Sequence, residues 1–146
     1  MILFSTPVIP ASADAFWELP ESDTELANIR MLVIARPLEK GSPAAVTLSK
    51  MMTACRLGPD DYAVLQLTPG QALSWSLLRG QTAATFVLLL GVMPAELGIQ
   101  AMFAFNRPNA FSGATFIPGL PLEQLVADGN SRRDLWEGGL KPAFGI

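Results

Sequence analysis

The sequence predicts an α/β fold, a three-layer α/β/α sandwich around a mainly parallel sheet of four to five strands. Strand-like and helix-like segments alternate from residue 29 onward, which implies parallel strands joined by crossover helices. Phe86–Leu90 is a continuous apolar run bounded by Gly91 and Pro94. Such a run is typical of a strand buried on both faces. A strand of this kind requires covering segments on each side of the sheet.

The composition indicates one domain with an unusually uncharged surface. Its 146 residues can bury a substantial core. Half of them are apolar and 16% are charged, against about 25% in an average soluble domain. Two interpretations stay open: an exposed apolar surface for a partner or a second copy, and a well-filled core under a sparsely charged surface. The net charge of −3 argues against direct nucleic-acid binding, which normally needs a basic patch.

No targeting or membrane segment is predicted. The N-terminus lacks a basic region before its apolar residues, so we expect no secretory signal. The longest apolar run is about half of what a membrane span requires. We therefore expect a cytoplasmic protein without a membrane partner. The single cysteine, Cys55, excludes an internal disulfide, and its apolar helical position favours a buried side chain over a reactive thiol.

Residues 1–28 are predicted to form a partly flexible N-terminal arm, and residues 29–146 the single α/β domain. The arm combines prolines and acidic residues with the aromatic pair Phe16 and Trp17. Two interpretations of this pair remain: it binds a protein partner, or it packs back onto its own domain.

The first predicted strand of the domain is Ile29–Ala35, which is almost entirely apolar. A helix follows, with Ser42 as its N-cap and Pro43 in its first position, and Gly58 ends it. Apolar residues at helical spacing give this helix one buried face: Leu48, Met51, Met52 and Cys55.

Tyr62–Leu67 is the second predicted strand, and Thr68, followed by a proline, starts a helix that extends to about Leu78. The central strand and a short helix come next. Gln100–Asn106 is expected to be a strand or an extended segment, and Ala110–Pro118 the last strand.

The C-terminal part is predicted to contain two helical pieces. Pro121–Ala127 forms the first piece, and residues 128–130 interrupt the helical structure before the second piece. Ser131 and Asp134 resemble a capping box at the start of the second piece. Gly138 and Gly139 weaken that piece by roughly 1 kcal/mol each relative to alanine, so it needs tertiary support.

Ligands of parallel α/β sheets bind at the carboxyl ends of the strands. Loops 91–94 and 118–121 are expected at that edge, and the loop after the first strand adds the polar candidates Arg36, Glu39, Lys40 and Ser42. The chain has no histidine, which excludes His-based acid–base catalysis and His-ligated metals. No P-loop or dinucleotide-binding glycine motif follows a strand. We therefore predict no catalytic residues, no metal and no cofactor.

A family resemblance over residues 29–144 rests on four sequence segments, which we call phrases: LGPDDYAVLQLTPGQAL, VLLLGVMPAELGI, ATFIP and LPLEQLVADGNSRRDLWEGGLKPAF. In these phrases the chain resembles the uracil-DNA-glycosylase fold, and more narrowly its degenerate members typified by the psi subunit of bacterial DNA polymerase III. Where active glycosylases carry a water-activating Asp or Asn after the first strand, this chain has Ala35, Arg36 and Pro37, and only the proline matches. The histidine of the family's second motif is missing from residues 118–121.

The resemblance thus implies a non-catalytic protein-interaction domain, a psi-like accessory subunit of the replicative polymerase and clamp loader. The partners it implies are chi-like or clamp-loader subunits. Two alternatives remain open. One is a small-ligand binder or enzyme that uses Arg36, Glu39 and Lys40. The other is self-association of the chain through an exposed apolar surface.

Overall fold

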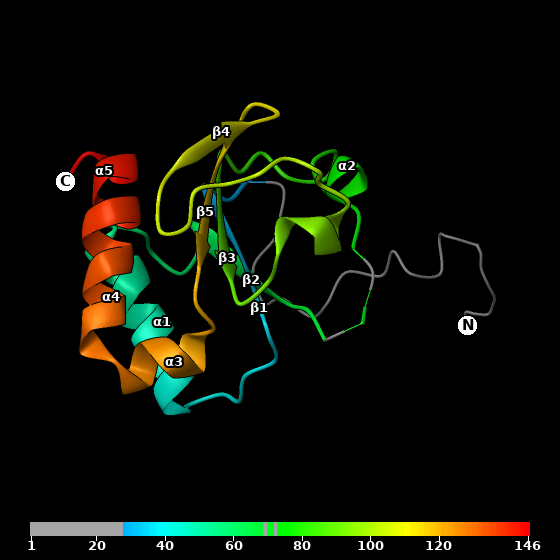
Figure 1. The fold of residues 1–146 in the computed structure, drawn as a ribbon. Coiled ribbons are helices and arrows are strands. Elements are labelled where there is room, and N and C mark those ends of the chain that lie inside the picture. Colours follow the sequence, from blue (N-terminus) through cyan, green and yellow to red (C-terminus); the bar gives the residue numbers. More distant parts are fainter. Residues whose placement is uncertain (1–27, 69, 72) are drawn as a thin grey trace.

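The computed structural model describes residues 28–68, 70–71 and 73–146 (Figure 1). The predicted arm, with Phe16 and Trp17, lies outside the described residues apart from its last position. Among the described residues, no helix is long and apolar enough to cross a membrane.

A five-stranded sheet forms the centre of the domain, in the order β2-β1-β3-β5-β4. All neighbours are parallel except β4 and β5, which are antiparallel. A mixed α/β fold with a mostly parallel sheet is therefore confirmed. The strands are β1 (Met31–Ala35), β2 (Tyr62–Gln66), β3 (Phe86–Leu90), β4 (Asn109–Phe111) and β5 (Ala114–Gly119).

The parallel strands end at one common edge. Ala35 is in register with Gln66 of β2 and with Leu90 of β3, and Leu90 is in register with Gly119 of β5. The loops that follow these strands therefore meet at the carboxyl edge of the sheet. In this sheet the strand order reverses between β1 and β3, which is where ligands of such folds bind.

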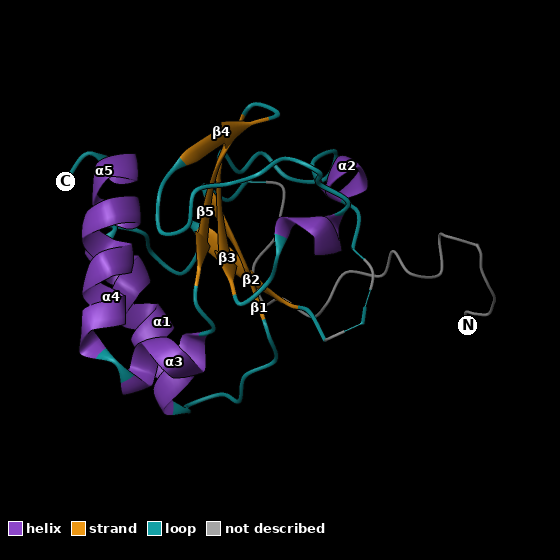
Figure 2. Ribbon diagram, viewed as in Figure 1, coloured by secondary structure: helices purple, strands orange, loops and turns teal. Residues whose placement is uncertain are grey.

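Regular helices cover one face of the sheet, which we call the α1 face (Figure 2). Ser42 caps α1 as predicted, because its Oγ accepts a hydrogen bond from the Ala45 amide at 3.2 Å. The helical segments on this face are α1 (Pro43–Ala54), α3 (Leu122–Ala127), α4 (Gly129–Leu135), the π-helical turn η3 (Trp136–Leu140) and α5 (Lys141–Phe144).

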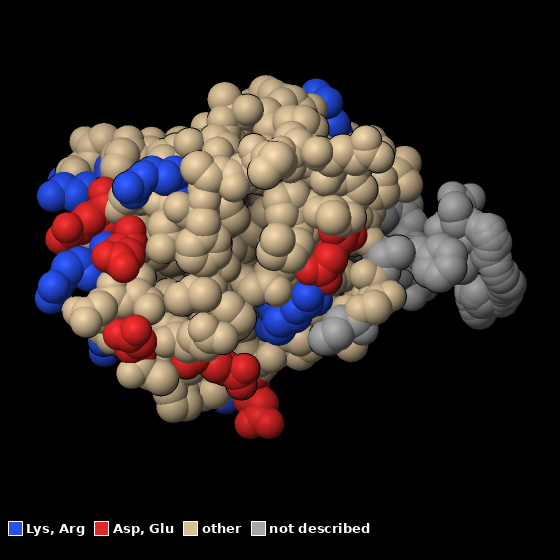
Figure 3. Space-filling view, viewed as in Figure 1, with Lys and Arg blue, Asp and Glu red and all other residues tan. Residues whose placement is uncertain are grey.

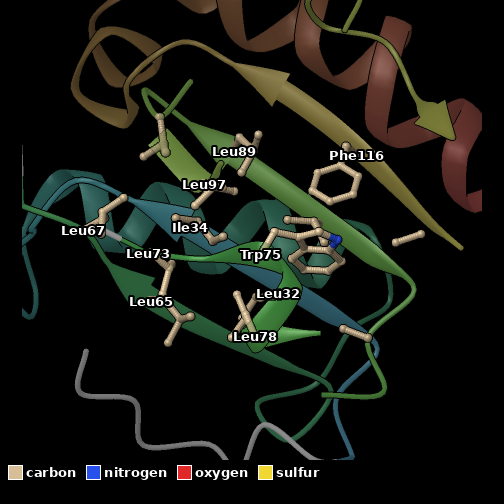
Figure 4. Packing of buried hydrophobic residues seen from close by; sticks show 14 of the residues in the cluster. Leu32, Ile34, Leu65, Leu67, Leu73, Trp75, Leu78, Leu89, Leu97 and Phe116 are labelled. Atoms are coloured by element: carbon tan, nitrogen blue, oxygen red, sulfur yellow. The ribbon is translucent and has the colours of Figure 1, made fainter. Parts of the chain in front are cut away.

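The opposite face, which we call the α2 face, has two short helices and irregular chain in the part that the structure describes. The helices are α2 (Trp75–Leu78) and the 3₁₀ helix η2 (Pro94–Leu97). Its core centres on Phe116, whose ring centroid lies 4.9 Å from that of Trp75 and 5.2 Å from that of Phe103. Figure 4 shows Trp75 and Phe116 packed with leucines of the central strands. The predicted helical layer on the α2 face is thus mostly irregular chain rather than regular helix.

The prediction of a helix from Thr68 to Leu78 is wrong, because the helix begins only at Trp75. Gly70 has φ +86°, which a right-handed helix does not allow. The chain makes a turn instead, in which the Gln71 amide donates to the Thr68 carbonyl at 2.9 Å.

The prediction of one continuous last strand at Ala110–Pro118 is also wrong, because this segment forms two strands, β4 and β5. Ser112 and Gly113 both have positive φ, 53° and 80°, and they form the two-residue loop between β4 and β5. Positive φ at both positions defines a type I′ turn, whose twist suits a tight hairpin. The segment therefore folds back on itself.

Two helix ends differ from the predictions. Helix α1 ends at Ala54, and the left-handed residue that follows its C-cap is Arg56, with φ +64°, rather than Gly58. The Leu57 amide donates to the Met52 carbonyl at 3.0 Å, and the Arg56 amide donates to the Thr53 carbonyl at 2.9 Å. These two bonds form a Schellman motif, which satisfies carbonyl groups at the helix end.

Helix α4 is capped by Asp128 and not by Ser131. The Ser131 hydroxyl donates to the Asp128 carboxylate at 2.9 Å, and the Asn130 amide donates at 3.0 Å. Both hydrogen bonds lower the pKa of Asp128, and the bond from the Ser131 hydroxyl contributes most. Ser131 is therefore a donor to the cap and lies within the helix.

Gly138 and Gly139 let the C-terminal helix approach the Asn106 turn closely. A Cβ on Gly138 would lie 2.8 Å from the Asn106 carbonyl oxygen, and one on Gly139 would lie 2.8 Å from Ile117 Cγ2. Neither position has room for a side chain. The glycines weaken the isolated helix, but here they make its packing possible.

Candidate functional site

An apolar groove of about 760 Å³ opens at the carboxyl ends of β3 and β5. Three segments far apart in the sequence form its walls: residues 91–95, residues 98–103 with 105, and residues 118–121. The first and third include loops that the sequence places at this edge. A groove of this size falls within the range of ordinary binding sites.

The groove is uncharged and its rim is exposed. Among the described residues that line it, Gln100 has the only polar side chain. Met93, Met102 and Phe105 are 67%, 98% and 51% exposed. In Figure 3 the visible charged side chains gather mainly over the helices at the left, and a broad uncharged surface lies over the middle of the view.

Glycine and proline set the shape of the first wall. Gly91 has φ +75°, and a Cβ there would lie within 3.0 Å of the Cα and Cβ atoms of Pro121. The loops after β3 and β5 therefore touch at this point, which only glycine permits. Pro94 then begins η2 as predicted, and Gly98, with φ +74°, ends it.

The second wall is a run over residues 99–104 that contains no helix, strand or turn. Its side chains alternate: Ile99 is buried, Ala101 and Phe103 pack against the core of the α2 face, and the residues between them are exposed. Alternation of this kind is the pattern of an extended chain. The prediction of a strand or extended segment at Gln100–Asn106 is confirmed as an extended segment over residues 100–104. It is wrong for residues 105 and 106, which form a turn in which Asn106 has φ +57°.

Hydrogen bonds hold the two ends of this run. The Ile99 amide donates to the Pro94 carbonyl at 3.1 Å. At the other end, the Ala104 amide donates to Asn109 Oδ1 at 2.8 Å, and Asn109 Nδ2 donates to the Ala104 carbonyl at 3.0 Å. Between these ends, Gln100–Phe103 have no backbone hydrogen bond within the described part of the chain.

Arg36 lies where the strand order reverses, but it is already paired. Its Nη2 is 2.6 Å from Glu96 Oε1, and its Nη1 donates to the Leu67 carbonyl at 3.3 Å. The other Glu96 oxygen accepts from the Met93 amide at 2.8 Å. Arg36 thus connects the ends of β1 and β2 to η2, and through η2 to the groove rim.

A second cleft of about 530 Å³ lies between the loop after β1 and the start of α3. Arg36, Glu39 and Ser42 line it, so the structure brings together three of the four predicted loop candidates. Lys40 is exposed and is not part of the lining. The Ser42 hydroxyl is occupied as the cap of α1.

The described residues contain no group of three or more His, Cys, Asp or Glu side chains that could hold a metal. Cys55, the C-cap residue of α1, is buried, and burial raises its pKa to about 11, so its thiol is neutral at physiological pH. No protein-family model and no curated protein matches the sequence.

The sequence analysis missed Met93, Met102, Phe105 and Glu96. The alternation around Met102 is a usable signal, because an apolar residue on the outer side of an extended run is left exposed. Glu96 carries no comparable signal, since its partner is 60 positions away.

Proposed function

We propose that this chain is a non-catalytic protein-interaction domain that binds a partner protein through the apolar groove. The observation that carries the proposal is the uncharged lining with Met93, Met102 and Phe105 exposed on its rim. Methionine and aromatic side chains are enriched in protein interfaces. Contiguous exposed apolar surface of this kind marks contact sites.

The narrower proposal is a uracil-DNA-glycosylase-like fold with a psi-like role in replication. It is supported by the phrases over residues 29–144 and by the lack of the histidine that active members carry. Chi-like or clamp-loader subunits are the proposed partners, with Phe16 and Trp17 as a second contact. The mostly parallel sheet is compatible with this fold, but fold alone does not carry function.

A second candidate function is the binding of a small ligand in the cleft lined by Arg36, Glu39 and Ser42. Its support is the place of Arg36 at the reversal of strand order. The Arg36–Glu96 pair counts against it, because a ligand anion would have to displace a carboxylate 2.6 Å away.

Site-specific photo-cross-linking in the native host tests the leading proposal. A benzophenone side chain is placed at position 102 of the full chain, and as a matched control at position 77. Leu77 is also an exposed apolar residue, 47% accessible, but it lies on α2 outside the groove. Cross-linked proteins are identified by mass spectrometry.

We expect a protein that cross-links from position 102 and not from position 77. Polymerase or clamp-loader subunits in that product would support the psi-like role, and another protein would support the groove alone. Identical products from the two positions, or none from position 102, would contradict the proposal. The substitution Met102→Asp should weaken recovery of the partner at least tenfold, since it buries a charge without a counter-ion (roughly 1.4 kcal/mol or more).

A further inference from the structure

We infer that the groove receives an extended, uncharged segment of the partner protein, which pairs as a β-strand with Gln100–Phe103. The inference rests on the proposed function and adds the form and chemistry of the ligand. Two observations carry it: the backbone of Gln100–Phe103, which has no hydrogen bond to another described backbone group, and the absence of charge in the lining.

The backbone of Gln100–Phe103 offers four amide donors and four carbonyl acceptors in an extended chain. None of them has a backbone partner within the described residues. The ends of the run are fixed by Pro94 and by the Asn109 side chain, so the segment is held in place without a neighbouring strand. An extended edge of this kind is a template for strand addition.

The free backbone distinguishes among possible ligands. A helix uses its own amides and carbonyls internally, and an apolar small molecule or an acyl chain has few groups to offer. An extended peptide presents donors and acceptors at the spacing of the run, about 3.3 Å per residue. Four paired residues correspond to a ligand segment of roughly 13 Å.

The lining determines which side chains the ligand carries. Alternate residues of an added strand point toward the groove, where Met93, Phe103 and Leu120 are among the apolar contacts. The described lining holds no charged group to pair with an inserted carboxylate or ammonium, and an unpaired charge in an apolar site is costly. We therefore assign a segment with uncharged apolar residues at every second position.

Two phage-displayed libraries selected on the full-length protein test the form of the ligand. In one library apolar residues occupy every second position of a seven-residue segment. In the other they follow helical spacing over fourteen residues. Selection on the Met102→Asp variant and on the matched off-groove variant Val46→Asp, at a residue 44% exposed on α1, identifies groove-dependent binders.

We expect groove-dependent binders from the alternating library, with affinity at least tenfold lower for Met102→Asp and unchanged for Val46→Asp. Groove-dependent binders from the helical library alone would overturn strand pairing and leave the proposed function standing. Binders that both variants retain equally, or no binders from either library, would overturn the inference. The cross-linking experiment at position 102 then decides the proposed function separately.

Amide hydrogen exchange by NMR tests the pairing directly with a selected peptide. We expect at least tenfold slower exchange at alternate amides within Gln100–Phe103, because an added strand bonds every second residue. A bound peptide that leaves all four amides unchanged would overturn strand pairing. Met102→Ala serves as the control, since it removes the exposed side chain and keeps every backbone donor.

Discussion

The two faces of the sheet are closed in different ways, although both hold fully buried cores. On the α1 face, residues 43–54 form a regular twelve-residue helix with a capped start. On the α2 face the helices have four residues each. The positive φ of Gly70 excludes a helix before α2, and Gly98, also with positive φ, ends η2. The groove is lined by the segments around Gly91 and Gly98 on this face. Regular helices therefore close a face, and irregular chain leaves an apolar groove beside a backbone segment, Gln100–Phe103, without hydrogen bonds to other described backbone groups.

The largest expected effect comes from core truncations that compare the two faces. Phe116→Ala on the α2 face should destabilise the protein by about 3–5 kcal/mol, because its ring contacts Trp75, Phe103 and Phe111. Leu125→Ala on the α1 face should cost about 2–5 kcal/mol. Urea unfolding measures the loss of unfolding free energy in each variant. Titration with the peptide, corrected for the fraction of protein that is folded, measures its binding affinity.

Only Phe116→Ala should also weaken peptide binding, since Phe103 of the groove packs on the Phe116 ring. An equal loss of binding in Leu125→Ala would show that the two faces do not act independently.

A smaller effect is expected where the loops after β3 and β5 touch. Gly91→Ala should cost about 2 kcal/mol or more, from left-handed strain together with contact on Pro121. Gly41→Ala is the matched control, because Gly41 has the same φ of +75° and nothing within 4 Å of its added Cβ. The difference in unfolding free energy between the two variants measures the contact alone. Equal losses would show that Pro121 moves freely aside.

The ion pair between Arg36 and Glu96 should contribute about 1 kcal/mol, since both side chains are about a quarter exposed and water screens them. Glu96→Gln keeps an acceptor for the Met93 amide and removes the charge. We expect the loss of unfolding free energy caused by Glu96→Gln to be smaller at high salt concentration. Thermal unfolding at two salt concentrations measures this, and a salt-independent loss would point to the hydrogen bonds instead of the charge.

The smallest expected effect is a pH dependence of the unfolding free energy that comes from Cys55 on the α1 face. Burial raises the pKa of Cys55 from 9.0 to about 11, so the folded chain keeps the proton at pH values where the unfolded chain releases it. The corresponding stability is fully present below pH 9 and is lost as the pH rises toward 11. Cys55→Ala should lack this part of the decline. A wild-type decline identical to that of the variant would contradict the burial of the thiol.

Much of the fold was predictable because local chemistry determines it. Apolar runs identified β1, β2 and β3, and the Ser42 and Pro94 signals identified the starts of α1 and η2. The errors came from backbone conformations that compete with propensity. Arg56 and Ser112 take positive φ without being glycine, and Gly70 interrupts a segment whose composition favours a helix.

The candidate site was predictable only in part. Two of its loops were expected at the carboxyl edge, since strand ends fix that position. The groove itself depends on contacts between residues distant in sequence, such as Gly91 against Pro121. The free backbone of Gln100–Phe103 also could not be predicted, because it depends on which strands fail to pair beside it.

The contact of Gly138 and Gly139 with Asn106 has a consequence for how distant relatives can be recognised. Substitution at either position would push the C-terminal helix away from Asn106 and Ile117, so both positions tolerate little change. We expect chains that share this architecture to retain two adjacent small residues late in the sequence, after overall identity has become undetectable.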